Sequence, residues 1–140
     1  LKLPITTSKG EATTLGDQLG TNKAILLDFW ASWCGPCMEL MPELRKKSES
    51  LGKHHIAVVG MNTESDEAVA DKVRRDKDMK LPWLVEPKGE PFSGPLGINS
   101  IPRMVLVSLE GKILFNGHPQ DPALWAALKG VDGTIEAPKE

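Results

Sequence analysis

The sequence predicts an α/β fold in which a mixed central β-sheet is flanked by helices. Residues 24–30 and 56–62 are nearly continuous apolar runs of strand length, as expected for central strands that are covered on both faces. Between these runs, residues 37–51 place apolar side chains at helical spacing, so a helix connects the two strands. A hairpin and a closing helix follow later in the chain. This order of elements describes a mixed sheet between helices.

The remaining elements can be assigned in order along the chain. Residues 2–7 predict a short strand, which is followed by a turn over 8–11 and a capped helical turn over 13–20. The helix that starts at Cys37 ends at Gly52. The later elements are an N-capped amphipathic helix over 65–78, a short strand over 81–87, an irregular or helical link over 91–98, a hairpin over 102–118 turned at Glu110 and Gly111, and a terminal helix over 121–131.

Length and composition are those of a single globular domain. With 140 residues, 40% of them hydrophobic and 26% charged, we expect one domain over residues 1–140 with a flexible tail from about residue 132. The formal net charge of −2 argues against nucleic acid or an anionic membrane as the main partner, and no apolar stretch is long enough for membrane insertion. The chain begins with Leu1, so we expect a processed or trimmed product, which is compatible with a lost leader or anchor.

Cys34 and Cys37 are the only two cysteines, and they are separated by Gly35 and Pro36. A disulfide between them would close too short a loop to stabilise the fold much. A zinc site needs four ligands, and the neighbouring histidines His54 and His55 do not naturally face one ion. We therefore expect no metal and interpret the pair as redox-active. A pair of buried structural cysteines is the alternative.

Several motifs at defined spacings accompany the cysteine pair. The stretch FWASWCGPC at 29–37 directly follows Asp28, an acid inside an otherwise apolar run. Pro42 lies five residues beyond Cys37, and SIP at 100–102 precedes a hydrophobic run and an EGK turn. In this combination the sequence resembles the thioredoxin superfamily, which keeps a buried aspartate, a helix-kinking proline and a cis-proline at these places.

The resemblance extends to the TlpA/ResA-like thiol-disulfide oxidoreductases. About forty residues separate Asn62 from Pro102, which is longer than in a plain thioredoxin, and the N-terminal segment is similar to the hairpin of that group. The resemblance implies a thioredoxin fold with an N-terminal hairpin and a central strand–helix insert. Two departures are visible: Ser100 and Arg103 replace the glycine and threonine that flank the thioredoxin cis-proline, and Met61 stands where a lysine would neighbour the buried aspartate.

The position of the cysteines at a helix start predicts their roles. Free N–H groups at the first turn favour negative charge on the first sulfur, so we expect Cys34 to be exposed and to act as the nucleophile. Cys37, about one turn inside, would resolve the mixed disulfide. Gly35 sets the turn, and Pro36 in the first helical turn loses no needed N–H.

Asp28 is expected to be desolvated, which would raise its pKa and allow it to accept the proton of Cys37 directly or through one water. The alternative is an aspartate paired locally with backbone or with a lysine. Glu64 follows the second central strand, roughly where ResA-like proteins carry an acid near the site. The preferred interpretation of Glu64 is a solvated loop residue.

The resemblance implies a cis bond before Pro102, which would leave the Ile101 backbone free to pair with an extended substrate chain. Trp33 and Ile101 would form an apolar lip around the reactive sulfur. Arg103 would lie close to the bound partner and favour acidic or carbonyl-rich segments, or alternatively point to solvent and cover the sheet edge. Trp30 is expected to be a core residue.

Together these expectations describe an enzyme, a protein-disulfide reductase that needs no cofactor other than its own Cys34–Cys37 disulfide. A disulfide oxidase or isomerase, a redox-inert peptide-binding module and a peroxidase are the alternatives. We expect a monomer that reduces a protein disulfide, contributes to cell redox homeostasis and draws on a membrane-linked or thioredoxin-type electron donor. Family habit places it outside the cytoplasm, in the periplasm, with a membrane anchor conceivable in a longer protein.

Overall fold

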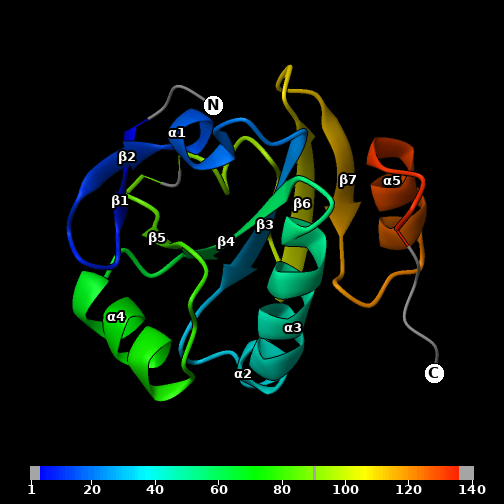
Figure 1. Ribbon diagram of the computed structural model, residues 1–140. Coiled ribbons are helices and arrows are strands. Elements are labelled where there is room, and N and C mark those ends of the chain that lie inside the picture. Colours follow the sequence, from blue (N-terminus) through cyan, green and yellow to red (C-terminus); the bar gives the residue numbers. More distant parts are fainter. Residues whose placement is uncertain (1–3, 90, 136–140) are drawn as a thin grey trace.

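The computed structural model describes residues 4–89 and 91–135 (Figure 1). The strands are β1 (Pro4–Thr7), β2 (Ala12–Thr14), β3 (Ala24–Trp30), β4 (Ile56–Asn62), β5 (Trp83–Val85), β6 (Arg103–Ser108) and β7 (Ile113–Gly117). The helices are α1 (Leu15–Leu19), α2 (Gly35–Glu39), α3 (Met41–Gly52), α4 (Glu67–Asp76) and α5 (Ala123–Val131). None of these helices, in the part of the chain that the structure describes, is long and apolar enough to cross a membrane.

All seven strands form one sheet in the order β2-β1-β5-β4-β3-β6-β7. The central strands β3, β4 and β5 are parallel to one another, whereas the N-terminal hairpin β1–β2 and the hairpin β6–β7 join them in antiparallel fashion. The sheet is therefore mixed, as predicted, and the N-terminal hairpin extends it beyond β5. The two central apolar runs form β3 and β4 with the predicted bounds.

Side chains alternate between the two faces of the sheet, and each face has its own core. On one face, the helices α2 to α5 pack against residues such as Leu26, Trp30 and Leu106. On the other face, α1 and Phe92 of the later turn segment cover residues such as Leu27 and Phe29. All seven residues of β3 are buried because both faces of this central strand are covered.

The helix expected from Cys37 onward is divided into two. The first helix, α2, begins at Gly35 and ends at Glu39, and α3 begins at Met41. Pro42 lies in the first turn of α3, where its missing N–H cannot donate to the preceding turn. The break therefore falls where the proline was expected to kink the helix.

The carboxyl ends of the parallel strands meet at one edge of the sheet. Cys34 follows β3, Glu64 follows β4 and Glu86 follows β5. Strand β6 is antiparallel to β3, with Arg103 opposite Phe29, so Pro102 enters the sheet at the same edge. The topology thus brings four separate loops to the cysteine pair.

The structure agrees with the expectation for one connecting segment and corrects the expectation for the C-terminal tail. The link at 91–98, expected to be irregular or helical, consists of turns, since its glycines and prolines interrupt helical hydrogen bonding. The expected tail does not start at 132, because Ile135 is only 2% exposed and Asp132 bonds to His54 and Thr134. Residues 136–140 of that tail lie outside the described residues.

Candidate redox site

Cys34 and Cys37 form a disulfide at the start of α2. A turn leads from β3 to this helix, closed by the Cys34 N–H, which donates to the Ala31 carbonyl over 3.1 Å. Cys34 is the N-cap of α2, and its sulfur accepts a hydrogen bond from the Cys37 N–H at 3.2 Å. That contact uses one of the free donors at the helix start to stabilise negative charge on the Cys34 sulfur.

In this disulfide form both sulfurs are covered. Cys34 is 4% exposed and Cys37 is 3% exposed, so the expectation of an exposed first thiol is wrong for the oxidised state. The physical reason is that the Cys34 sulfur is bonded to the sulfur of Cys37, the buried residue of α2. Around it, Gly35 and Pro36 are exposed, and Trp33 is 73% exposed. Because its indole is so exposed and adjoins Cys34 in the chain, Trp33 provides an apolar contact for a partner chain.

Asp28 is a buried acid, 6% exposed, in the middle of β3. It lies on the same face of the strand as Leu26 and Trp30, which belong to the core cluster that contains both cysteines. Burial raises the pKa of the Asp28 carboxyl from 3.8 to about 7, and the charge of Lys47 opposes that rise. A carboxyl with such a pKa can both accept and release a proton near neutral pH.

Lys47 is a site residue that was not among the residues expected at the site. It is half-buried on α3, with its ammonium 5.7 Å from the centre of the Trp125 ring. Burial lowers the pKa of Lys47, while the charges of Asp28 and Glu43 oppose this. The missing lysine partner of Asp28 is therefore supplied by α3. Helical spacing indicates that position 47 lies on the buried side of α3, since it is three residues after Leu44 and four before Leu51, both of them buried.

Glu64 is bound to the loop that precedes the cysteines, so the preferred interpretation as a solvated residue is wrong. Its carboxylate accepts hydrogen bonds from the Ser32 N–H at 2.5 Å and from the Ser32 hydroxyl at 2.8 Å. The fully buried Asn62 donates to the same carboxylate at 3.0 Å and accepts from the Glu64 N–H at 2.9 Å. Because these contacts join two loops, no local sequence pattern pointed to them.

The peptide bond between Ile101 and Pro102 is cis. Ile101 is half-buried and packs against both core clusters, and Pro102 is buried. Arg103, the next residue, lies against β7, where its Nε donates to the Asn116 side-chain oxygen at 2.6 Å and its Nη2 to the Asn116 carbonyl at 3.4 Å. Its guanidinium thus covers the sheet edge, the alternative position considered for it.

A second buried acid, Glu86, anchors the turn segment beside the site. It is 1% exposed, and its carboxylate accepts hydrogen bonds from Phe92 N–H, Ser93 N–H and the Ser93 hydroxyl at 2.8, 2.6 and 2.7 Å. Asn116 donates to the Leu96 carbonyl at 3.0 Å and so holds the far end of the same segment. In the sequence, this role of Glu86 was indicated only by its position directly after the apolar strand Trp83–Val85.

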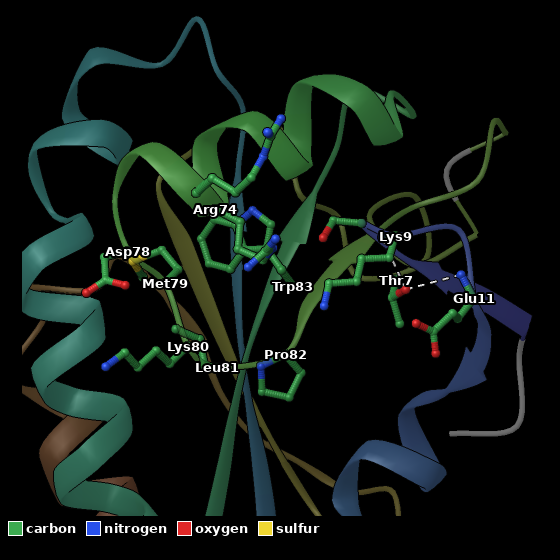
Figure 2. A pocket seen from close by; sticks show the side chains of 12 residues that line it. Thr7, Lys9, Glu11, Arg74, Asp78, Met79, Lys80, Leu81, Pro82 and Trp83 are labelled. Carbon is green, nitrogen blue, oxygen red and sulfur yellow. Dashed lines mark hydrogen bonds between the residues drawn. The ribbon is translucent and has the colours of Figure 1, made fainter.

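A groove in the described part of the chain lies away from the cysteines. It has a volume of about 630 Å³ and is bordered by the β1–β2 turn on one side and the α4–β5 connection on the other. Figure 2 shows Trp83 between Lys9 on one side and Met79 and Lys80 on the other. Trp83 also packs against Trp30, with ring centres 4.9 Å apart, so Trp30 is the core residue expected. Neither cysteine lines this groove.

No group of three or more histidine, cysteine or acidic side chains is placed to hold a metal ion within residues 4–89 and 91–135. Cys34 and Cys37 lie at the common edge of the strands and are joined by a disulfide. The arrangement can carry two electrons in the disulfide and one proton on Asp28.

Comparison with known proteins gives a consistent result. The family model described as Redoxin matches residues 1–133. The thiol-disulfide oxidoreductase ResA of Bacillus cereus is 24% identical over 110 residues, which are 79% of this chain. The thioredoxin-like protein YneN of Bacillus subtilis is 33% identical over 110 residues, 76% of this chain. The chain spans 62% of the length of both relatives.

Among solved structures, a thiol-disulfide oxidoreductase from Bacteroides fragilis superposes with a TM-score of 0.78 at 25% identity. The match covers 92% of this chain and 96% of that chain. The likeness therefore extends over most of the fold and is not confined to the segment that carries the cysteines.

Proposed function

The chain belongs to the Redoxin family, within the thioredoxin superfamily, and we propose that it catalyses thiol–disulfide exchange with a disulfide of a protein partner. The observation that carries the proposal is the Cys34–Cys37 disulfide at a helix start, in the core cluster on that face of the sheet where Asp28, a buried acid of raised pKa, also lies. The ResA relative and the Bacteroides fragilis structure, which are described as thiol-disulfide oxidoreductases, support it.

The first step belongs to Cys34. In the reduced protein its thiolate attacks one sulfur of the partner disulfide, whose S–S bond breaks as the new Cys34–partner bond forms. The other partner sulfur leaves as a thiolate and takes a proton. The helix-start hydrogen bond from the Cys37 N–H stabilises the attacking thiolate, which raises the fraction of reactive sulfur at neutral pH.

The second step belongs to Cys37 and Asp28. The Cys37 thiol passes its proton to the Asp28 carboxylate, directly or through one water, and attacks the Cys34 sulfur. The Cys34–Cys37 disulfide forms and the second partner thiolate is released. The partner gains two electrons, and the chain loses two. The electrons reside in the cysteine pair, so the proposed reaction includes no bound cofactor.

Recognition of the partner would use the edge where the loops meet. Trp33 offers an exposed apolar side chain, and its neighbours Gly35 and Pro36 are exposed as well. The backbone of Ile101, before the cis bond to Pro102, would pair with an extended segment of the partner. Arg103 would contribute its charge from the side of β7.

We propose that the reaction runs in the reducing direction and that the chain acts as a monomer outside the cytoplasm, in the periplasm, as part of cell redox homeostasis. Proteins with disulfides to be reduced occur in oxidising compartments, where a reductase depends on an outside supply of electrons. A membrane-linked or thioredoxin-type donor would re-reduce the Cys34–Cys37 disulfide. The direction of exchange follows from the reduction potential of the Cys34–Cys37 pair compared with that of the compartment around it.

The test is reduction of insulin by dithiothreitol with catalytic amounts of the protein, compared with a Cys34→Ser variant. We expect catalysis that the variant abolishes. A Cys37→Ser variant should instead accumulate a mixed disulfide through Cys34, which mass spectrometry of the trapped species identifies. Insulin reduction at the uncatalysed rate would contradict the activity and favour a redox-inert binding module.

A further inference from the structure

His118 lies at the cysteine edge of the sheet, and the exchange reaction described above does not use it. Strand β7 is antiparallel to β6, and β6 is antiparallel to β3, so β7 runs in the same direction as β3 (Figure 1). Both strands therefore end at the same edge of the sheet. The turn after β3 leads to Cys34, and the first residue after β7 is His118.

The strand register places His118 beside the loop that contains the cis-proline. Gly117, the last residue of β7, pairs with Met104, so His118 lies level with Arg103 in the neighbouring strand. Arg103 directly follows Pro102, whose preceding peptide bond is cis. Since neighbouring strands are about 5 Å apart, the His118 backbone lies about one strand spacing from the segment that would pair with an extended partner.

One nitrogen of the His118 ring is engaged and the other is free. Its Nδ1 accepts a hydrogen bond from the Gln120 N–H at 3.1 Å. A ring nitrogen that accepts carries no proton, so the proton of the neutral ring lies on Nε2. Among the residues that the structure describes, no hydrogen bond or ion pair uses Nε2, and His118 is exposed. The Nε2–H is therefore an available donor at the edge where the loops meet.

The other two histidines of the chain do not share this position. His54 and His55 precede β4 and so lie at the end of the sheet opposite to the cysteines. Nδ1 of His54 is 3.3 Å from an Asp132 carboxylate oxygen and 3.0 Å from the Thr134 hydroxyl, so this ring holds the segment after α5. His55 is exposed, as His118 is, and provides a control at the far end of the sheet.

We propose that His118 is a specificity-determining residue, which donates its Nε2–H to a main-chain carbonyl of the partner beside the partner's disulfide. This proposal rests on the exchange function proposed above. An extended partner segment that pairs with the Ile101 backbone carries carbonyl groups along both of its sides, and a donor one strand away can bind one of them. His118 thereby favours disulfides carried by an extended polypeptide over small disulfides that have no carbonyl group.

Two substitutions separate the roles of the two ring nitrogens. The side-chain oxygen of His118→Asn can reach the position of Nδ1 and still accept from the Gln120 N–H, whereas the outer donor is lost. The amide of His118→Gln is one carbon longer and returns a donor near the position of Nε2. His55→Asn is the matched control, because asparagine suits the left-handed backbone at His55, where φ is 61°.

The activity measurement compares a neutral peptide disulfide with bis(2-hydroxyethyl) disulfide, which has no carbonyl group. With the peptide, His118→Asn should lower kcat/KM about two- to tenfold, mainly through KM, as expected for the loss of one neutral hydrogen bond. His118→Gln should recover part of this loss, and His55→Asn should match the parent. All variants should reduce the small disulfide at the parental rate.

Three outcomes of this comparison would overturn the proposal. The first is an unchanged rate of His118→Asn with the peptide. The second is equal slowing with both disulfides, because the substitution would then act on the redox site itself. The third is a His118→Gln variant as slow as His118→Asn, because the effect would then belong to the bulk of the ring and not to its donor.

A trapped complex tests the same contact without turnover. In a Cys37→Ser variant, Cys34 can be joined chemically either to the peptide or to 2-mercaptoethanol. By nuclear magnetic resonance, we expect the Nε2 proton of His118 to exchange slowly with water in the peptide complex only, and that of His55 to exchange rapidly in both. Identical His118 signals in the two complexes would overturn the proposal. Failure of the parent protein to reduce either disulfide would instead count against the exchange function, and the trapped complexes would still decide the role of His118.

Discussion

The Asp28 carboxylate on β3 and the Lys47 ammonium on α3 interact across the interface between the sheet and the helix that follows the cysteines. Burial raises the pKa of Asp28 to about 7, and Lys47 limits that rise. The same burial lowers the pKa of Lys47, with Asp28 opposing it. Each charge therefore moderates the effect of burial on the pKa of the other group. The lysine comes from the helix directly after the one that carries Cys37.

Asp28→Asn should stabilise the protein in a pH-dependent way. The folded-state pKa of about 7 exceeds the ordinary value of 3.8, so the folded protein holds a proton that the unfolded chain has lost. Below about pH 4 the burial of Asp28 therefore does not lower the free energy of unfolding through its charge. The loss of stability grows as the pH rises toward 7. We expect the variant to gain little at pH 4 and on the order of 2–4 kcal/mol at pH 8, since each unit is worth about 1.4 kcal/mol.

Urea unfolding of the oxidised protein at pH 4, 6 and 8 measures this difference. Asp17→Asn on α1 is the control, because that aspartate is exposed and lies far from the cysteines in the sequence. A gain that is equal at all three pH values would show that the Asp28 carboxyl is not the titrating group. Resolution of the mixed disulfide by Cys37 should also slow in Asp28→Asn, while the first attack by Cys34 changes less.

Lys47→Met should shift the resolution of the mixed disulfide by Cys37 to higher pH. Without the cation, nothing of comparable strength opposes the effect of burial, and the pKa of Asp28 should rise above about 7. The carboxylate would then become available as a base only at higher pH. Stopped-flow resolution of a Cys34 mixed disulfide against pH measures the midpoint. Lys46→Met, an exposed neighbour on the same helix, is the matched control, and coincident profiles for the two variants would contradict the role of Lys47.

Gly60→Ala should destabilise the core beneath the site. The ring of Trp83 lies directly against Gly60, where an added β-carbon would overlap two of its carbon atoms. Trp83 cannot retreat freely because it packs on Trp30. We expect a loss of about 1–3 kcal/mol in the free energy of unfolding. Gly130→Ala in α5 meets no neighbouring atom and should instead be neutral or stabilising by up to about 1 kcal/mol. Equal stability of the two variants would contradict this packing.

The sequence predicted the elements whose local pattern is strong, and it could not predict contacts between loops. β3 and β4 are recognisable because both faces of a central strand must be apolar, and the acid inside β3 stands out for the same reason. Glu64 and Ser32 are 32 residues apart and meet only because two parallel strands end at the same edge. Lys47 was not expected at the site because a charged residue is normally placed on the solvent face of a helix, although a long side chain can bury its stem and still reach a buried acid.

Arg103→Thr tests whether this residue acts by charge or by holding the neighbouring loops. Arg103 bonds to Asn116, and Asn116 in turn bonds to the Leu96 carbonyl of the turn segment. If the charge acts on a partner, Arg103→Thr should slow reduction of an acidic peptide disulfide about two- to fivefold at low salt, with an effect that fades as salt is added. Asn116→Ala keeps the charge and breaks the link to Leu96, so it should leave that salt dependence in place. A loss of rate that is the same in both variants, independent of salt and equal for a small neutral disulfide, would assign Arg103 to the support of β7 and the turn segment instead.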